Sequence, residues 1–154
     1  MTKKKILIDL DILTVAFWDN KKEAIEFLNR VRKGEFELYI PYSLFELLGK
    51  WKHKPLTNKI IEFYKLFGLR VISAQDILNE FKKNNLDYEK IVNEFQQKKI
   101  KEEDITLILI TSIFDLDYLI TYNKIHLKNK KEVINSILRY RGLKEIIIIE
   151  PTEI

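Results

Sequence analysis

Acidic side chains interrupt or follow apolar segments at several points of the chain, where carboxylates can hold metal ions. Asp9 and Asp11 lie inside an apolar run near the start of the sequence. Glu46 follows a second apolar segment, and Asp104 begins a third. A carboxylate among apolar residues costs free energy unless it is paired or bound to a metal. Oxygen ligands suit Mg²⁺ and Mn²⁺, which promote the attack of water on phosphodiesters, so the pattern predicts a site of that kind.

Each of these acids also has a purely structural interpretation. Asp9 and Asp11 are two positions apart, so on one strand they would share a face and bond to backbone amides where the strand ends. Ser43-x-x-Glu46 is a capping-box pattern, in which the glutamate only bonds the start of a helix. Asp104 opens an apolar helix, where an acid is favoured by the helix dipole. The metal site therefore requires that several of these acids converge.

Apolar strands alternate with helices along the chain. The first strand is predicted over 6–13 and four more over 36–40, 69–72, 118–121 and 146–149. Helices are predicted over 21–33, 43–52, 56–67, 76–83, 88–97, 102–114 and 132–140, with Gly34 and Gly68 ending two of them. The alternation indicates a three-layer α/β/α sandwich with a central, mostly parallel sheet of four to five strands. Ligands bind beyond the carboxyl ends of such strands, which is where the acids lie.

Four segments carry the candidate residues in order: Ile8–Leu13, Ile40–Leu48, Lys101–Leu107 and Leu116–Leu127. Together they resemble the four motifs of the PIN-domain family, which includes the VapC-like toxin ribonucleases, over roughly residues 5 to 150. The resemblance implies the following site residues: Asp9, Glu46 and Asp104 as metal ligands, Asp11 as a further candidate ligand, and Thr121 and Asn123 beside the metal.

The resemblance implies a PIN-like fold and a metal-dependent endoribonuclease that uses Mg²⁺ or Mn²⁺ and leaves a 5′-phosphate. It also implies a cytoplasmic toxin of a toxin–antitoxin pair, with an antitoxin protein and a second copy of the chain as partners. One position departs from the family, which often has a fourth aspartate where this chain has Asn123. A neutral ligand there weakens a second metal, and Asp11 is placed to restore the charge.

Composition bounds these inferences. The 154 residues fit one domain, 1–154, and the hydrophobic fraction of 46% allows a core. The chain has no cysteine, which excludes disulfides and zinc–thiolate sites. The formal charge of +4 permits a polyanionic partner. No apolar stretch approaches the ~20 residues that span a bilayer, so we expect a soluble cytoplasmic protein.

Two lysine-rich tracts flank the predicted site. Lys50, Trp51 and Lys52 form the first, and Lys124 and Lys128 belong to the second. Lysines neutralise phosphates and a tryptophan stacks on bases, so both tracts are candidate contacts to single-stranded RNA. The alternative is a solvated lysine face.

Several other residues are better explained by structure than by chemistry. Asp117, His53 and His126 are predicted to be strand-start or turn residues that bond backbone. The apolar helix over 56–67 either packs in the core or meets another chain.

Two other functions fit parts of the pattern. The segment 7–14 also resembles the first motif of haloacid dehalogenase-like phosphatases, in which the first aspartate is the nucleophile, and Ser73 would supply the second motif. The lack of an acidic pair after a late strand disfavours that interpretation. The other alternative is a PIN-like module that binds RNA or a partner protein without cutting, and Asn123 is its main support.

Overall fold

The computed structural model describes residues 2–67 and 70–154, and a parallel β-sheet runs through its centre. Within these residues the sheet has five strands in the order β3-β2-β1-β4-β5, and each neighbouring pair is parallel. Their bounds are β1 Lys4–Ile8, β2 Phe36–Pro41, β3 Val71–Ile72, β4 Tyr118–Ile120 and β5 Ile148–Ile149. The predicted three-layer α/β/α class is confirmed.

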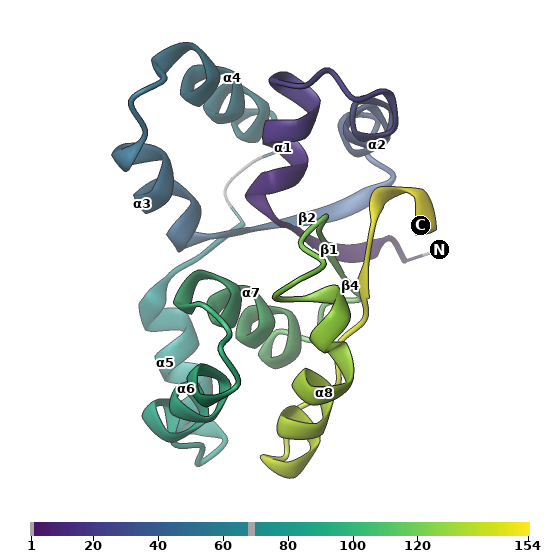
Figure 1. Ribbon diagram of the computed structural model, residues 1–154. Coiled ribbons are helices and arrows are strands. Elements are labelled where there is room, and N and C mark those ends of the chain that lie inside the picture. Colours follow the sequence, from purple (N-terminus) through teal and green to yellow (C-terminus); the bar gives the residue numbers. More distant parts are fainter. Residues whose placement is uncertain (1, 68–69) are drawn as a thin grey trace.

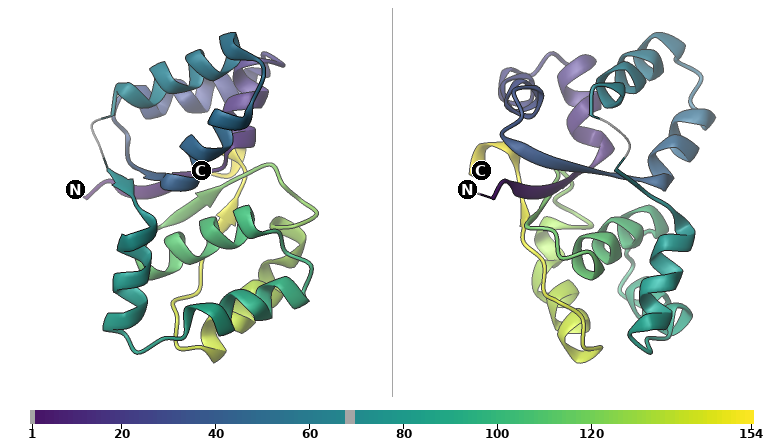
Figure 2. Two further views of the ribbon diagram at one scale, coloured as in Figure 1. Left: turned by 90° about the vertical axis from the view of Figure 1, so that its left-hand side faces the viewer. Right: turned by 180° about the vertical axis from the view of Figure 1, so that it is seen from behind.

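Helices cover both faces of the sheet (Figures 1 and 2). One face carries α1 Leu10–Phe17, α2 Lys22–Arg32, α3 Tyr42–Lys50 and α4 Lys54–Lys65. The other face carries α5 Ala74–Lys83, α6 Tyr88–Gln97, α7 Glu102–Ile113 and α8 Lys131–Tyr140. Short 3₁₀ helices occupy Lys128–Lys130 (η1) and Pro151–Glu153 (η2).

The central strand alternates between two hydrophobic cores. Ile6 and Ile8 of β1 pack with α1 to α4, whereas Leu7 packs with α5 to α8. This period of two follows from the pleat of a strand, and it explains why the strand is apolar throughout. α7 packs against the sheet with every residue from Asp104 to Ser112 buried, as its apolar sequence predicts.

The predicted strand over 6–13 is wrong in its second half. β1 ends at Ile8, and α1 begins at Leu10 and buries Ile12, Leu13 and Ala16. A short, uniformly apolar run does not distinguish a buried strand from a buried helix, so α1 was missed. Asp9 and Asp11 therefore do not share a strand face: Asp9 is the residue just before the helix, without a capping bond from its side chain, and Asp11 lies in the first turn.

The remaining elements lie close to their predicted positions. The helix over 88–97 has the predicted bounds, and the others differ by a few residues at their ends. The last strand is shorter than predicted, at Ile148–Ile149. Of the predicted strand over 69–72, Val71 and Ile72 form β3, while residue 69 and the predicted stop at Gly68 lie outside the described residues.

Two questions left open by the sequence concern apolar helices. α4 turns Leu56, Ile60 and Phe63 into the core, so its apolar residues are explained by packing within the chain. No helix in the described part of the chain is both long and apolar enough to cross a membrane.

Candidate active site

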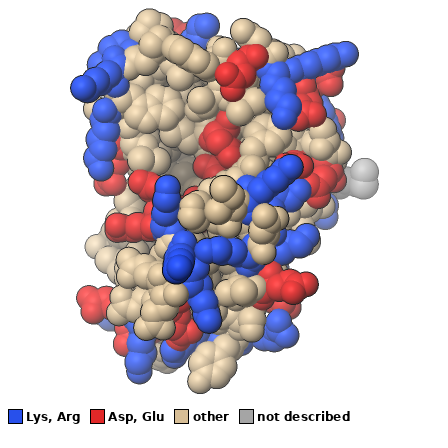
Figure 3. All heavy atoms as spheres, viewed as in Figure 1, with Lys and Arg blue, Asp and Glu red and all other residues tan. Residues whose placement is uncertain are grey.

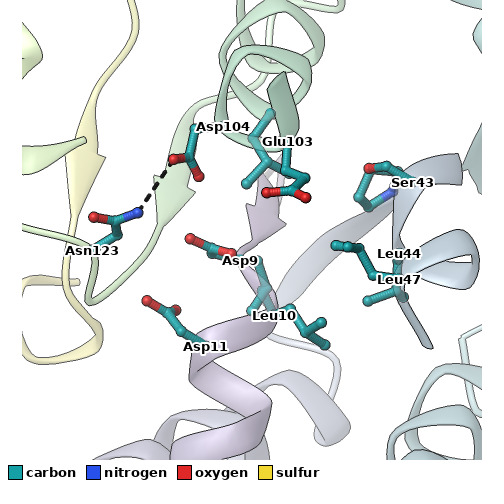
Figure 4. A pocket seen from close by; sticks show the side chains of 12 residues that line it. Asp9, Leu10, Asp11, Ser43, Leu44, Leu47, Glu103, Asp104 and Asn123 are labelled. Carbon is teal, nitrogen blue, oxygen red and sulfur yellow. Dashed lines mark hydrogen bonds between the residues drawn. The ribbon is translucent and has the colours of Figure 1, made fainter. Parts of the chain in front are cut away.

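A hollow opens beyond the carboxyl ends of β1, β2 and β4, between the first turns of α1, α3 and α7. Its volume is about 280 Å³. Carboxylates stand on one side and apolar side chains on the other, as Figure 4 shows. We call it the acidic pocket; its polar lining residues are Asp9, Asp11, Ser43, Glu103, Asp104 and Asn123, and its apolar ones are Ile8, Leu10, Pro41, Leu44, Leu47 and Leu107. Figure 3 shows acidic atoms in a hollow near the middle of this face, with lysine and arginine side chains around it.

Asp9 is placed by the end of the central strand. Its backbone N–H donates to the carbonyl of Ile120 at 2.9 Å, which continues the β1–β4 ladder by one residue. Its side chain accepts from the Thr121 hydroxyl at 2.8 Å rather than capping α1. Burial raises the pKa of this carboxyl, although the bond from Thr121 acts in the opposite direction.

Asp11 reaches the same threonine from the first turn of α1. Its Oδ2 accepts from the backbone N–H of Tyr122 at 3.0 Å and lies 3.3 Å from the Thr121 hydroxyl. Its Oδ1 is buried without a hydrogen-bond partner among the described residues. Burial, and next the charge of Asp9, raise the pKa of Asp11 to about 7.

Asp104 enters the pocket from the first turn of α7 and is buried, with 7% of its surface exposed. The amide of Asn123 donates to its Oδ2 over a long 3.4 Å, drawn as the dashed line in Figure 4. Burial, then the negative charges of Asp9 and Glu103, raise the pKa of Asp104 to about 6. Lys101 lowers it, but by less than burial and these charges raise it.

Thr121 connects the two sides of the pocket, and it is fully buried directly after β4. A hydroxyl has one proton to donate, and the shorter contact assigns that proton to Asp9. Its oxygen also accepts from the backbone N–H of Asn123 at 2.9 Å. Asn123 is fixed in turn, because its Oδ1 accepts from the backbone N–H of His126 at 3.0 Å. The segment that follows β4 thus connects five of the predicted residues: Asp9, Asp11, Asp104, Thr121 and Asn123.

Glu46 is the predicted metal ligand that the structure does not bring into this group. It is exposed, and the described residues that line the pocket include its helix neighbours Ser43 and Leu47 but not Glu46. The capping-box interpretation fails as well, because α3 begins at Tyr42 after Pro41 and Ser43 lies inside the helix. One residue corresponds to a rotation of about 100° around a helix, which turns Glu46 away when Leu47 faces the pocket.

Glu103 lines the pocket instead, although it is not among the site residues that the sequence predicts. It precedes Asp104 in the first turn of α7, and its charge raises the pKa values of both Asp9 and Asp104. The signal was present in the acidic run Glu102, Glu103 and Asp104, but such runs are also common at helix starts.

The chemistry of these donors fits a divalent cation. Among residues 2–67 and 70–154 no lysine or arginine forms an ion pair with Asp9, Asp11 or Asp104, so their charges are uncompensated. In the same residues no three His, Cys, Asp or Glu side chains stand close enough to form a metal site by themselves. Mg²⁺ is usually bound by one or two carboxylates and several waters, so this donor set suits Mg²⁺ better than a cation that needs a full protein cage.

The residues predicted to contact RNA lie in two separate places. Lys128 is engaged by Glu150 at 3.3 Å and by Glu153 at 2.5 Å, and Lys124 is exposed. Lys50 and Lys52 are exposed and Trp51 is half-buried, and all three line a second hollow rather than the acidic pocket.

Asp117, His53 and His126 are expected to be structural, whereas Ser73 is the candidate second motif of a phosphatase. Asp117 accepts from the backbone N–H of Lys5 at 2.8 Å, at the opposite end of β4, and His53 caps α4 by accepting from Leu56 at 3.1 Å. These two predictions are confirmed. His126 donates only its backbone N–H, and its buried Nδ1 has no partner in the described part of the chain. Ser73 caps α5 by accepting from the backbone N–H of Asp76, so it is not presented as a second phosphatase motif.

Comparison with known proteins supports the fold. The fold of this chain is similar to that of a chain in the crystal structure of VapBC2 from Rickettsia felis, which is bound to a DNA fragment from its promoter. The match has a TM-score of 0.58 and 14% sequence identity, and it covers 95% of this chain and 98% of that chain. No family model matches the sequence, and no curated protein matches it. At this identity the similarity concerns the fold.

Proposed function

We propose that this chain is a divalent-metal-dependent endoribonuclease. The observation that carries the proposal is a set of carboxylates at the carboxyl ends of the strands, Asp104 buried and Asp9 and Asp11 half-buried, without cationic partners among the described residues. Keeping several like charges in one buried place costs stability, and a bound cation would recover that cost. A protein retains such an arrangement most readily where the cation is used.

Each residue has a distinct role in this proposal. Asp9 and Asp104 would hold Mg²⁺ or Mn²⁺, with Asn123 as a neutral neighbour and Asp11 as an additional carboxylate. The cation would supply positive charge to the scissile phosphate and lower the pKa of water beside it. Thr121 holds the Asp9 carboxylate in place by a hydrogen bond. It also accepts a hydrogen bond from the backbone of Asn123, whose side chain donates to Asp104.

A fourth acid would complete the pocket, and we assign that position to Glu103 in preference to Glu46. Both glutamates are exposed, but Glu103 lines the pocket at the start of α7, whereas Glu46 on α3 is not among the lining residues. An exposed glutamate beyond the rim can still contact the substrate, so the two residues make a matched pair for mutagenesis.

The RNA substrate and the toxin role are supported by two independent likenesses. Four ordered segments of the sequence resemble PIN-domain motifs, and the fold is similar to a chain of a VapBC2 complex. We therefore expect that induced expression of the chain arrests growth, that Asp104→Asn abolishes the arrest, and that a partner protein covers the acidic pocket.

Cleavage of a labelled single-stranded RNA tests the activity. Wild type and Asp104→Asn are compared in Mn²⁺, in Mg²⁺ and in EDTA, with 5′-phosphate on the products as a second readout. Asp115→Asn is the matched control, because Asp115 is an exposed aspartate that pairs with Lys144 away from the pocket. Metal-dependent cleavage that Asp104→Asn abolishes and Asp115→Asn keeps is the expected result.

A second candidate is a PIN-like module that binds RNA or a partner without cutting. It is favoured by the neutral Asn123 and by the lack, within the described residues, of three grouped metal-binding side chains. Binding of RNA by folded protein, with no cleavage in either metal and no effect of Asp104→Asn, would select this function.

A further inference from the structure

The two tryptophans of the chain lie together on one surface, although 32 residues separate them in sequence. Trp18 follows the end of α1 and has 55% of its surface exposed, and Trp51 follows the end of α3. Adjoining hollows share Trp18, His53 and Leu56 in their linings. We call this the tryptophan–lysine surface; the residues that define it are Trp18, Lys50, Trp51, Lys52, His53 and Lys59.

Both tryptophan rings are held by neighbouring residues, and Trp51 is half-buried against the core that α1 to α4 cover. The ring of Trp18 meets the ring of His53 edge to face, with centroids 4.5 Å apart and planes at 85°. His53 is itself fixed, because its Nδ1 caps α4. An exposed aromatic ring with a fixed orientation loses little conformational entropy when a second planar group stacks on it.

The charge of this surface is of one sign. The described residues that line the hollows include Lys50, Lys52 and Lys59 and no aspartate or glutamate. None of these three lysines has an ion pair within the described chain, in contrast to Lys128. Figure 3 shows blue side chains bordering an uncharged area over the connection between α3 and α4.

Helices α1 and α3 connect this surface to the acidic pocket. Both begin at the pocket, where Asp11 and Ser43 lie in their first turns, and both end at the surface. With eight and nine residues, they span about 12 to 14 Å at ~1.5 Å per residue. A stacked strand rises ~3.4 Å per nucleotide, so about four nucleotides would cover this distance.

We infer that the tryptophan–lysine surface binds a segment of single-stranded RNA and leads it toward the acidic pocket. Bases would stack on Trp18 and Trp51, and phosphates would lie against Lys50, Lys52 and Lys59. The inference rests on the proposed function and names its substrate class. The acidic pocket repels phosphates, so attraction for the substrate has to come from another surface.

Single-stranded RNA fits this surface better than other occupants. A duplex keeps its bases stacked on one another and offers no free faces to the tryptophans. A second copy of the chain in a two-fold contact would bring the same lysines together, and like charges in a contact are unfavourable.

Intrinsic fluorescence provides the test, because the chain has no tryptophan outside this surface. Asp104→Asn protein in EDTA is titrated with a short oligouridine and with an RNA hairpin that has a fully paired stem. The single strand should change the tryptophan emission and bind at least tenfold more tightly than the hairpin. Binding is measured without cleavage, so failure of the nuclease proposal would not obscure the result.

Two variants separate this role from a structural one. Trp18→Ala should weaken oligouridine binding about tenfold, since stacking contributes ~1–3 kcal/mol per base. Lys50→Gln/Lys52→Gln/Lys59→Gln should flatten the dependence of log Kd on log salt by about two, at ~0.7 per phosphate contact. The matched control is Lys82→Gln/Lys83→Gln/Lys90→Gln, which alters exposed lysines on α5 and α6.

Three results would overturn the inference. The first is binding that leaves the emission unchanged, and the second is equal binding by the variants and the control. The third is emission that changes with protein concentration alone while sedimentation shows a dimer, because a second copy would then cover the surface.

Discussion

Two acidic groups lie at the carboxyl ends of neighbouring strands, and their electrostatics are opposite. In the acidic pocket, burial and mutual repulsion raise the pKa values of Asp11 and Asp104 to about 7 and about 6. Just after β5, Lys128 joins Glu150 and Glu153, and the bond from Lys128 lowers the pKa of Glu153. The acids after β5 have a lysine of the same chain as their partner, whereas the acids of the acidic pocket have none among the described residues.

The difference shows why an acidic cluster alone is a poor indicator of a metal site. Glu150 and Glu153 provide two carboxylates, a number that is common in cation sites, yet Lys128 already compensates part of their negative charge. In the acidic pocket the compensation is missing, and one oxygen of Asp11 has no hydrogen-bond partner in the described structure. Uncompensated burial, rather than acidity, distinguishes the candidate active site.

The sharpest contrast between the two groups should appear in catalysis. Asp9→Asn removes the carboxylate at the centre of the pocket and should lower kcat/KM at least ~10³-fold, because the charge that holds the cation is lost. Glu153→Gln should leave kcat/KM within about twofold of wild type. Initial rates of RNA cleavage in Mn²⁺ measure both, and equal losses would remove the distinction.

The stability of the metal-free protein should fall as pH rises from the unfolded-state pKa of Asp104 to its folded-state pKa. Asp104 has a pKa raised from 3.8 to about 6, so the folded state holds a proton that the unfolded state loses between these values. Above that window Asp104→Asn should be more stable than wild type by on the order of 1–2 kcal/mol, after allowance for partial screening.

Urea unfolding in EDTA at about pH 4 and about pH 7.5 measures this prediction. Addition of Mg²⁺ or Mn²⁺ should stabilise wild type at the higher pH and have little effect on Asp104→Asn. A difference between the two proteins that is the same at both pH values would contradict the assignment of the raised pKa to Asp104.

Glu103 and Glu46 should differ although both substitutions remove one negative charge. Glu103→Gln should lower kcat/KM about fivefold to tenfold and weaken the dependence on Mn²⁺, since Glu103 lines the pocket. Glu46→Gln should change kcat/KM less than twofold, because Glu46 is not among the residues that line the pocket. A reversed order would show that α3 rotates Glu46 inward when RNA and metal are bound.

The smallest expected effect belongs to the compensated group. The pKa of Glu153 is lowered by Lys128, so its stabilisation is present above the unfolded pKa and is lost as pH falls. Glu153→Gln should therefore cost a few tenths of a kcal/mol near neutral pH, as expected for a partly exposed ion pair. Thermal unfolding in low and high salt would test this, and the difference should shrink as salt increases.

Helix α1 shows where sequence patterns lose information. Its residues are as apolar as those of β1, and only the strands beside β1 decide that the ladder ends at Asp9. The missed helix did not displace the site, because Asp9 still lies at the carboxyl end of the central strand. The predicted strand over 6–13 therefore still places Asp9 correctly at the edge of the sheet. It is wrong only in placing Asp9 and Asp11 on one face of a strand.

The sequence by itself determined the alternation of strands and helices, and with it the parallel sheet. It also determined that Asp9, Asp104, Thr121 and Asn123 follow strands or begin a helix at one edge, because periodicity and chain order are local properties. Only the tertiary structure decided which side chains point inward there. The rotation of α3 and α7 about their axes excludes Glu46 and admits Glu103, and the fold pairs Lys128 with Glu153 and brings Trp18 beside His53. These outcomes depend on packing between residues distant in sequence, which the local spacing of residues does not specify.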